Sequence, residues 1–264
     1  MKNLKTYLII GIALFAFTSC EKEVVTPTAQ APINVTKNAS VNSTGVGGSL
    51  AQFTIVGDYL YTLDFKSVKV FDIKNSEVPQ LVNTVNLGYG IETIYSLEET
   101  IFIGTTNGVK ILSATDPVNI VEMSEFEHVT ACDPVIANSN HAFSTVRGGT
   151  PCGGSVNQLN IIDISTITNP ELRSSIELIN PYGLGFSNED ATVMYVCDGY
   201  DGLKGYDISD IENTIETMHY TEINARDVIS TDNDLLIVLG LDAIYQFDNS
   251  NPFDLVLKSE ISIQ

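Results

Sequence analysis

Apolar and polar residues alternate in short runs along most of the chain after residue 50, a period of two that is typical of β-strands. Between Lys66 and Ser250 one form of this run occurs five times, each time ending in a turn-forming polar residue. The five copies are Val68–Asp72, Val109–Ser113, Leu159–Asp163, Leu203–Asp207 and Ile244–Asp248, and their last residues lie 41, 50, 44 and 41 positions apart. A strand-based period of roughly 40–45 residues is the spacing of β-propeller blades. The pattern therefore predicts an all-β fold.

Each repeat divides into four strands separated by turn residues. The expected strands are Gln52–Val56, Tyr59–Asp64, Ser67–Ile73 and Leu81–Leu87; Glu92–Ser96, Thr100–Thr105, Gly108–Leu112 and Ile120–Glu125; Pro134–Ala137, His141–Val146, Asn157–Ile164 and Leu172–Leu178; Gly183–Ser187, Thr192–Cys197, Gly202–Ile208 and Ile215–Glu222; and Val228–Ser230, Leu235–Leu239, Ala243–Phe247 and Leu255–Ile261. We expect a five-bladed β-propeller over residues 49–264, closed by packing of the fifth blade on the first. A sixth, partial blade over Asn42–Ser49 is the alternative, although that segment has little apolar content.

Four of the five copies end in aspartate, at Asp72, Asp163, Asp207 and Asp248. An aspartate in this position can accept a hydrogen bond from the backbone amide two residues later and so form an Asx turn. One carboxylate per repeat at a turn favours a structural role over a metal site.

The first 19 residues have the layout of a bacterial signal peptide, with Lys2 and Lys5 followed by an apolar stretch too short to span a bilayer comfortably. The stretch ends at Phe17-Thr-Ser-Cys20, which resembles a lipobox, so we expect lipidation of Cys20. Residues 20–48, rich in Thr, Pro, Asn and Ser, are expected to form a flexible tether. We therefore expect lipid anchoring in a bacterial outer membrane, at the cell surface or the periplasmic face, and Glu21-Lys-Glu23 resembles a surface-export signal. An ordinary signal peptide with an incidental cysteine is the alternative.

The formal net charge is −20, and it becomes −22 when Lys2 and Lys5 leave with the signal peptide. Such a surface repels phosphate backbones, so nucleic acid is excluded as an expected partner. The charge fits an acidic, soluble extracytoplasmic domain.

The copy Leu159-Asn-Ile-Ile-Asp163, together with its four looser relatives, resembles the LVIVD repeat. Three further segments resemble lipoprotein members of that family, namely Cys152–Leu159, Asn180–Gly185 and Val196–Leu203. The resemblance covers the mature domain and implies a propeller fold and a bacterial envelope location. It assigns no activity.

Three cysteines are expected on one face of the propeller, where the second-to-third strand connections and the entries to the innermost strands lie. They are Cys132, Cys152 and Cys197. In an oxidising envelope a disulfide is expected, either Cys132–Cys152 within one blade or Cys152–Cys197 between blades. A three-cysteine metal site is a further alternative.

The same topology gathers two of the chain's three arginines with acidic groups and a tyrosine. These ligand-binding candidates are Glu92, Asp133, Arg147, Tyr182, Asp198, Asp201, Arg226 and Asp227. Arginine forks beside carboxylates and an aromatic ring can orient a polar ligand; alternatively the arginines pair with Asp198 or Asp227 and hold loops together. Residues 198–202 could ligate calcium but lack the full spacing of a calcium loop, so no cofactor is assigned.

No local catalytic signature is present: the sequence has no Gly-x-Ser-x-Gly elbow, no His-Glu-x-x-His and no phosphate-binding glycine loop. We assign no catalytic residue. The leading hypothesis is a binding module for a protein, a glycan or a small ligand. The alternatives are an extracytoplasmic hydrolase or lyase that uses carboxylates at the propeller mouth, and a structural envelope component without a ligand.

Overall fold

A computed structural model describes residues 48–128, 134–149, 154–188, 191–231 and 233–263. These residues form twenty β-strands and one 3-10 turn, η1 (Ile211–Asn213). In these segments no helix has the length and apolar character needed to span a bilayer.

The strands form five four-stranded antiparallel sheets, each built from four consecutive strands. Sheet 1 contains β1 (Phe53–Val56), β2 (Tyr59–Leu63), β3 (Ser67–Asp72) and β4 (Gln80–Asn86). Sheet 2 contains β5 (Ile91–Leu97), β6 (Thr100–Thr105), β7 (Gly108–Ser113) and β8 (Val121–Glu127). Sheet 3 contains β9 (Val135–Ala137), β10 (His141–Arg147), β11 (Asn157–Asp163) and β12 (Glu171–Glu177). Sheet 4 contains β13 (Leu184–Phe186), β14 (Val193–Cys197), β15 (Leu203–Asp207) and β16 (Ile215–Tyr220), and sheet 5 contains β17 (Ala225–Thr231), β18 (Leu235–Gly240), β19 (Ala243–Asp248) and β20 (Val256–Ser262).

The prediction of four strands in each of five repeats is confirmed, with most boundaries within two residues of the expected ones. The largest difference is β17, which begins at Ala225 rather than Val228. A register shift between Ala225 and Asp227 interrupts the alternation that the sequence shows there. Such a bulge lets a strand continue through an irregular pattern and turns a side chain to a new direction.

The predicted Asx turns are confirmed at all four aspartates. Their Oδ1 atoms accept hydrogen bonds from the backbone amides of Lys74, Ser165, Ser209 and Ser250, at 2.9, 2.9, 2.9 and 3.0 Å. These carboxylates therefore terminate the third strands and prepare the turn to the fourth.

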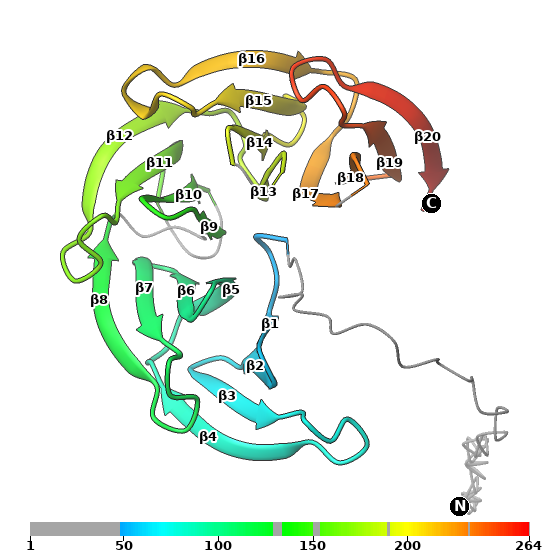
Figure 1. Ribbon diagram of the computed structural model, residues 1–264. Coiled ribbons are helices and arrows are strands. Elements are labelled where there is room, and N and C mark those ends of the chain that lie inside the picture. The colour runs from blue at the N-terminus through cyan, green and yellow to red at the C-terminus, as the bar shows by residue number, and fades with distance from the viewer. Residues whose placement is uncertain (1–47, 129–133, 150–153, 189–190, 232, 264) are drawn as a thin grey trace, which may run out of the picture. The chain divides into compact units, whose positions relative to one another are not determined.

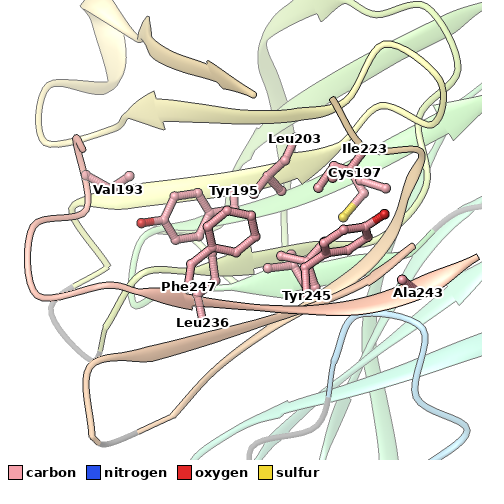
Figure 2. Packing of buried hydrophobic residues seen from close by; sticks show 12 residues of the cluster. Val193, Tyr195, Cys197, Leu203, Ile223, Leu236, Ala243, Tyr245 and Phe247 are labelled. Carbon is pink, nitrogen blue, oxygen red and sulfur yellow. The ribbon is translucent and has the colours of Figure 1, made fainter. Parts of the chain in front are cut away.

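The sheets follow one another around a centre, with the first strand of each sheet innermost (Figure 1). Consecutive sheets pack face to face through buried aliphatic and aromatic side chains. One such cluster, shown in Figure 2, joins sheets 4 and 5 through Tyr195, Cys197, Tyr245 and Phe247 among others. Because sheets 2, 3 and 4 each have a neighbour on both sides, their second strands are mostly buried, and β14 is buried along its whole length.

The sequence pattern led us to expect that sheet 5 packs on sheet 1 and closes the ring. This expectation is wrong for the described strands. Contacts between strands join every consecutive pair from sheet 1 to sheet 5, but no comparable contact joins sheet 5 to sheet 1, and Figure 1 shows an open side between them. At the centre, residues 48–51 make hydrogen bonds to sheets 4 and 2. Ser49 Oγ accepts a hydrogen bond from Leu184 N at 2.7 Å, and Ala51 O accepts one from Ile94 N at 2.9 Å.

Candidate functional site

Two guanidinium groups stack on one tyrosine ring near the ends of β10, β13 and β17. Arg147 is the last residue of β10, Arg226 lies in β17, and Tyr182 lies in the connection that leads into β13. The guanidinium carbons are 4.0 Å (Arg147) and 3.9 Å (Arg226) from the centroid of the Tyr182 ring. Three sheets thus supply one side chain each to a single cluster, which we call the arginine–tyrosine site.

Two backbone hydrogen bonds and one from a side-chain hydroxyl hold the backbone of Tyr182 and Gly183 in place. The N–H of Tyr182 donates to Cys197 O at 2.7 Å, and its carbonyl accepts from the fully buried Thr145 Oγ1 at 2.5 Å. The next residue, Gly183, donates its N–H to Arg226 O at 2.9 Å. These hydrogen bonds fix the backbone from which the Tyr182 ring extends to its contacts with the two arginines.

Among the described residues, neither arginine of this site forms an ion pair. Within the described segments, no carboxylate lies within salt-bridge distance of Arg147 or Arg226, although the charge of Glu92 acts on Arg147. Desolvation lowers the pKa of both arginines, and the positive charge of Arg147 lowers the pKa of Arg226 further. Arg226 Nε is buried and has no hydrogen-bond partner among the described residues. The described residues thus leave this donor without an acceptor and bring two like charges together.

Asp198 and Asp201, both ligand candidates, are engaged by one lysine instead of the arginines. Lys204 Nζ lies 2.7 Å from Asp198 Oδ2 and 2.7 Å from Asp201 Oδ2. Asp198 is fully buried and also accepts hydrogen bonds from the backbone amides of Ile179 and Asn180. These contacts give Asp198 the role of holding the loop before Tyr182, and the ammonium group occupies the position between two carboxylates that a cation would take.

Asp227 follows Arg226 but points into the interior. Its Oδ1 accepts a hydrogen bond from its neighbour Val228 N at 3.0 Å, and burial raises its pKa to about 6. Gly48 and Gly183 cover it: a Cβ at Gly48 would lie 2.8 Å from Oδ2, and one at Gly183 would collide with Oδ1. Asp227 is partly buried, and these two backbone segments shield its carboxyl.

Cys197 is fully buried in the cluster between sheets 4 and 5, as Figure 2 shows, and burial raises the pKa of its thiol. It makes no disulfide with any residue in the described part of the chain. Its proposed partner Cys152, like Cys132, Asp133 and the lipidation candidate Cys20, lies outside the described residues. Within those residues, no group of three or more His, Cys, Asp or Glu side chains is placed to hold a metal ion.

A separate cavity of about 1410 Å³ lies along the innermost strands and does not include the arginine–tyrosine site. Its walls include Thr54, Ile94, Ile136, Leu184 and Val228, and its rim carries the hairpin residues 138–140 and Asp234. These first-to-second strand hairpins mark the opposite end of the sheets from Arg147. This cavity and the arginine–tyrosine site therefore lie toward opposite ends of the sheets.

Sequence reasoning did not identify Thr145 and Lys204, which position the site. Thr145 lies two residues before Arg147 and therefore on the same side of β10, a relation that the strand period could have indicated. Lys204 is a nearly buried lysine within a strand, six residues after Asp198. A charged residue inside an apolar repeat is the signal that could have marked it, since buried charges are paired.

No protein-family model matches this sequence, and neither does any curated protein. Solved structures match at low identity. A functionally unknown protein from Desulfotomaculum acetoxidans is 13% identical with a TM-score of 0.62 over 79% of this chain and 67% of its own. A luciferin-regenerating enzyme is 14% identical with a TM-score of 0.52 over 83% and 76%, and apo AztD from Citrobacter koseri is 10% identical with a TM-score of 0.57 over 78% and 61%. These similarities show a β-propeller-like fold.

Proposed function

We propose that this chain is a bacterial outer-membrane lipoprotein, anchored through Cys20, whose propeller is a five-bladed array of LVIVD-like repeats that serves as a binding module. The support for the anchor is the signal-peptide pattern of residues 1–19 and the lipobox-like ending at Cys20. The support for the repeat is the periodic strand phrase, now accompanied by five sheets of four strands. In this proposal residues 21–48 carry the domain away from the membrane.

The ligand carries an acidic group, a carboxylate, phosphate or sulfate, that binds at the arginine–tyrosine site. The observation that supports this is the pair of stacked guanidinium groups, neither of which has a carboxylate within salt-bridge distance in the described chain. Two partly desolvated like charges at one site raise the free energy of the folded state, and an anionic ligand bound between them would lower it. The protein carries a net charge of −20, so such a cationic pair stands out from the rest of the chain. Arginine forms bidentate, charge-assisted hydrogen bonds with planar acidic groups, and the tyrosine ring limits how each guanidinium turns.

A binding role agrees better with the geometry than the hydrolase or lyase hypothesis. Asp227, the described carboxyl whose pKa suits acid–base work, is covered by the backbone at Gly48 and Gly183. The fold itself does not choose between the two classes, because one fold supports many functions.

The test is titration calorimetry of the chain with inorganic phosphate, sulfate and a short oligogalacturonate at low ionic strength. Arg147→Gln and Arg226→Gln should each weaken binding of the preferred probe by at least about tenfold, because each removes a charge-assisted hydrogen bond. Arg173→Gln is the matched control, since Arg173 is an exposed arginine on β12 whose Nε donates to Glu212 Oε1 at 2.6 Å. An equal loss in all three variants, or no binding of any probe, would contradict the assignment. Unchanged thermal midpoints would show that the variants remain folded.

A further inference from the structure

The cavity along the innermost strands has room for more than one small building block. Its volume of about 1410 Å³ exceeds the roughly 300–1,000 Å³ that is usual for a small-molecule site. Its walls include residues from the first strands of all five sheets, which surround the centre (Figure 1). Apolar side chains and two aromatic rings supply part of this surface, namely Ile94, Ile136, Leu184 and Val228 with Tyr95 and Phe186. Walls of this kind suit a ligand of several linked units, each with an apolar side.

Hydroxyl groups on the same walls have hydrogen-bonding capacity to spare. Thr54 Oγ1 and Ser96 Oγ lie 2.7 Å apart in a hydrogen bond between β1 and β5, and Thr54 is only 5% exposed. Two hydroxyls carry two hydrogens, and their mutual bond uses one of them, so the other can donate to a ligand. Ser230 Oγ donates its hydrogen to Phe186 O at 2.6 Å and keeps its lone pairs for a donor. The walls therefore offer a ligand both donors and acceptors.

The backbone edges of the innermost strands add further groups of both kinds. Each of these strands pairs with a neighbour of its own sheet on one side only, so alternate N–H and C=O groups point from its free edge. Ile94 N–H is one such donor and reaches Ala51 O at 2.9 Å, while Leu184 N–H reaches Ser49 Oγ at 2.7 Å. Ser96 follows Ile94 by two positions, and its backbone groups therefore lie on the same free edge. The donors and acceptors of these edges are uncharged.

The charged groups of the cavity are all at its rim and are all acidic. They are Glu98, Asp210 and Asp234, which are exposed and form no salt bridge with any described residue. The described wall residues include no lysine or arginine. Burial lowers the pKa of the wall residue His141, which keeps its ring neutral at pH 7. Such a rim repels anions, the reverse of the arginine–tyrosine site toward the other end of the sheets.

We propose that this cavity is a second binding site and that it holds a neutral oligosaccharide. Each sugar hydroxyl both donates and accepts a hydrogen bond, which matches the mixed donors and acceptors of the strand edges and of the Thr54–Ser96 pair. The C–H faces of the sugar rings pack on apolar and aromatic side chains such as Phe186. An organic ammonium ion suits the acidic rim less well than it first suggests, because it has donors and no acceptor for the donors of the walls.

Titration calorimetry of the full chain with cellotetraose, mannotetraose and maltotetraose at pH 7 tests the proposal. At least one of these neutral probes should bind, and its affinity should be the same with and without excess inorganic phosphate, which is directed to the arginine–tyrosine site. Spermidine is the cationic comparison. No binding of any of the three sugars, stronger binding of spermidine than of all three, or competition between sugar and phosphate overturns the proposal.

Substitutions on the wall then locate the sugar. Ser96→Trp should fill part of the cavity and weaken binding by at least about tenfold. Ser174→Trp is the matched control and should leave the affinity unchanged, since Ser174 is exposed on the outer strand β12 and is not a wall residue. Ser96→Ala adds no volume, so it serves if Ser96→Trp does not fold, and it should weaken binding about fivefold through the loss of one hydrogen bond. An affinity that both Ser96 variants leave unchanged, or an equal loss in Ser174→Trp, overturns the assignment to this cavity.

Discussion

Replacing Asp227 by asparagine should change how stability depends on pH. The carboxyl has an ordinary pKa of 3.8, and burial raises it to about 6 in the folded chain. Between these two values the folded state holds a proton that the unfolded state has released. The stabilising contribution of protonated Asp227 is therefore complete below pH 3.8 and is lost as pH rises through about 6.

The size of the effect follows from the two pKa values. The rise in pKa from 3.8 to about 6 means that ionisation of Asp227 lowers the free energy of unfolding above pH 7 by about 3 kcal/mol, relative to its value below pH 3.8. An asparagine cannot ionise, and its carbonyl oxygen can still accept the hydrogen bond from Val228 N. The free energy of unfolding of Asp227→Asn relative to the natural chain should therefore rise by up to about 3 kcal/mol between pH 4 and pH 8.

Urea denaturation at pH 4, 5, 6, 7 and 8 measures this difference, followed by far-ultraviolet circular dichroism. Taking the difference between variant and natural chain removes the pH dependence that the turn aspartates contribute to both. Asp254→Asn, an exposed carboxyl in the connection before β20, is the control and should show no rising difference. A flat difference for Asp227→Asn across this range would refute the claim that Gly48 and Gly183 desolvate the carboxyl.

Two further substitutions test the contacts that support the site and the core. Lys204→Met should lower the free energy of unfolding by about 3–5 kcal/mol, because it leaves the fully buried Asp198 without its ion-pair partner; urea denaturation at pH 7 checks this, and a loss below about 1 kcal/mol would contradict it. Tyr195→Phe should cost about 1–2 kcal/mol, because the hydroxyl donates to Asn249 Oδ1 at 2.5 Å and lies 3.1 Å from Pro252 O inside the core. An unchanged thermal midpoint for Tyr195→Phe would show that these hydrogen bonds contribute nothing.

The strands were predictable because every sheet uses the same alternation and the same turn chemistry. The approach of Arg147, Tyr182 and Arg226 also follows from topology, since the end of a second strand and the start of an innermost strand lie at the same edge of adjacent sheets. The partners of the carboxylates were not predictable in this way. Lys204 reaches Asp198 and Asp201 through the conformation of one turn, which no period in the sequence records.

The open side between sheets 1 and 5 could not be predicted from the sequence pattern either. The alternation in β2 and β18 has the same apolar character as in strands that are covered on both sides. Whether the last sheet reaches the first depends on the angle between successive sheets, which is set by side-chain packing at four junctions. Small differences in that angle add up around the ring, and the pattern of apolar residues does not encode their sum.

The contact of residues 48–51 with the centre has a mechanical consequence. Ser49 and Leu184 are 135 residues apart in the chain, yet their hydrogen bond ties the start of sheet 1 to sheet 4, while Ala51 is tied to sheet 2. A pull on the N-terminal end is therefore resisted at the centre of the molecule before β1 can peel from β2. Because this contact joins residues 135 apart, it closes a long loop and forms only once the start of β13 is in place.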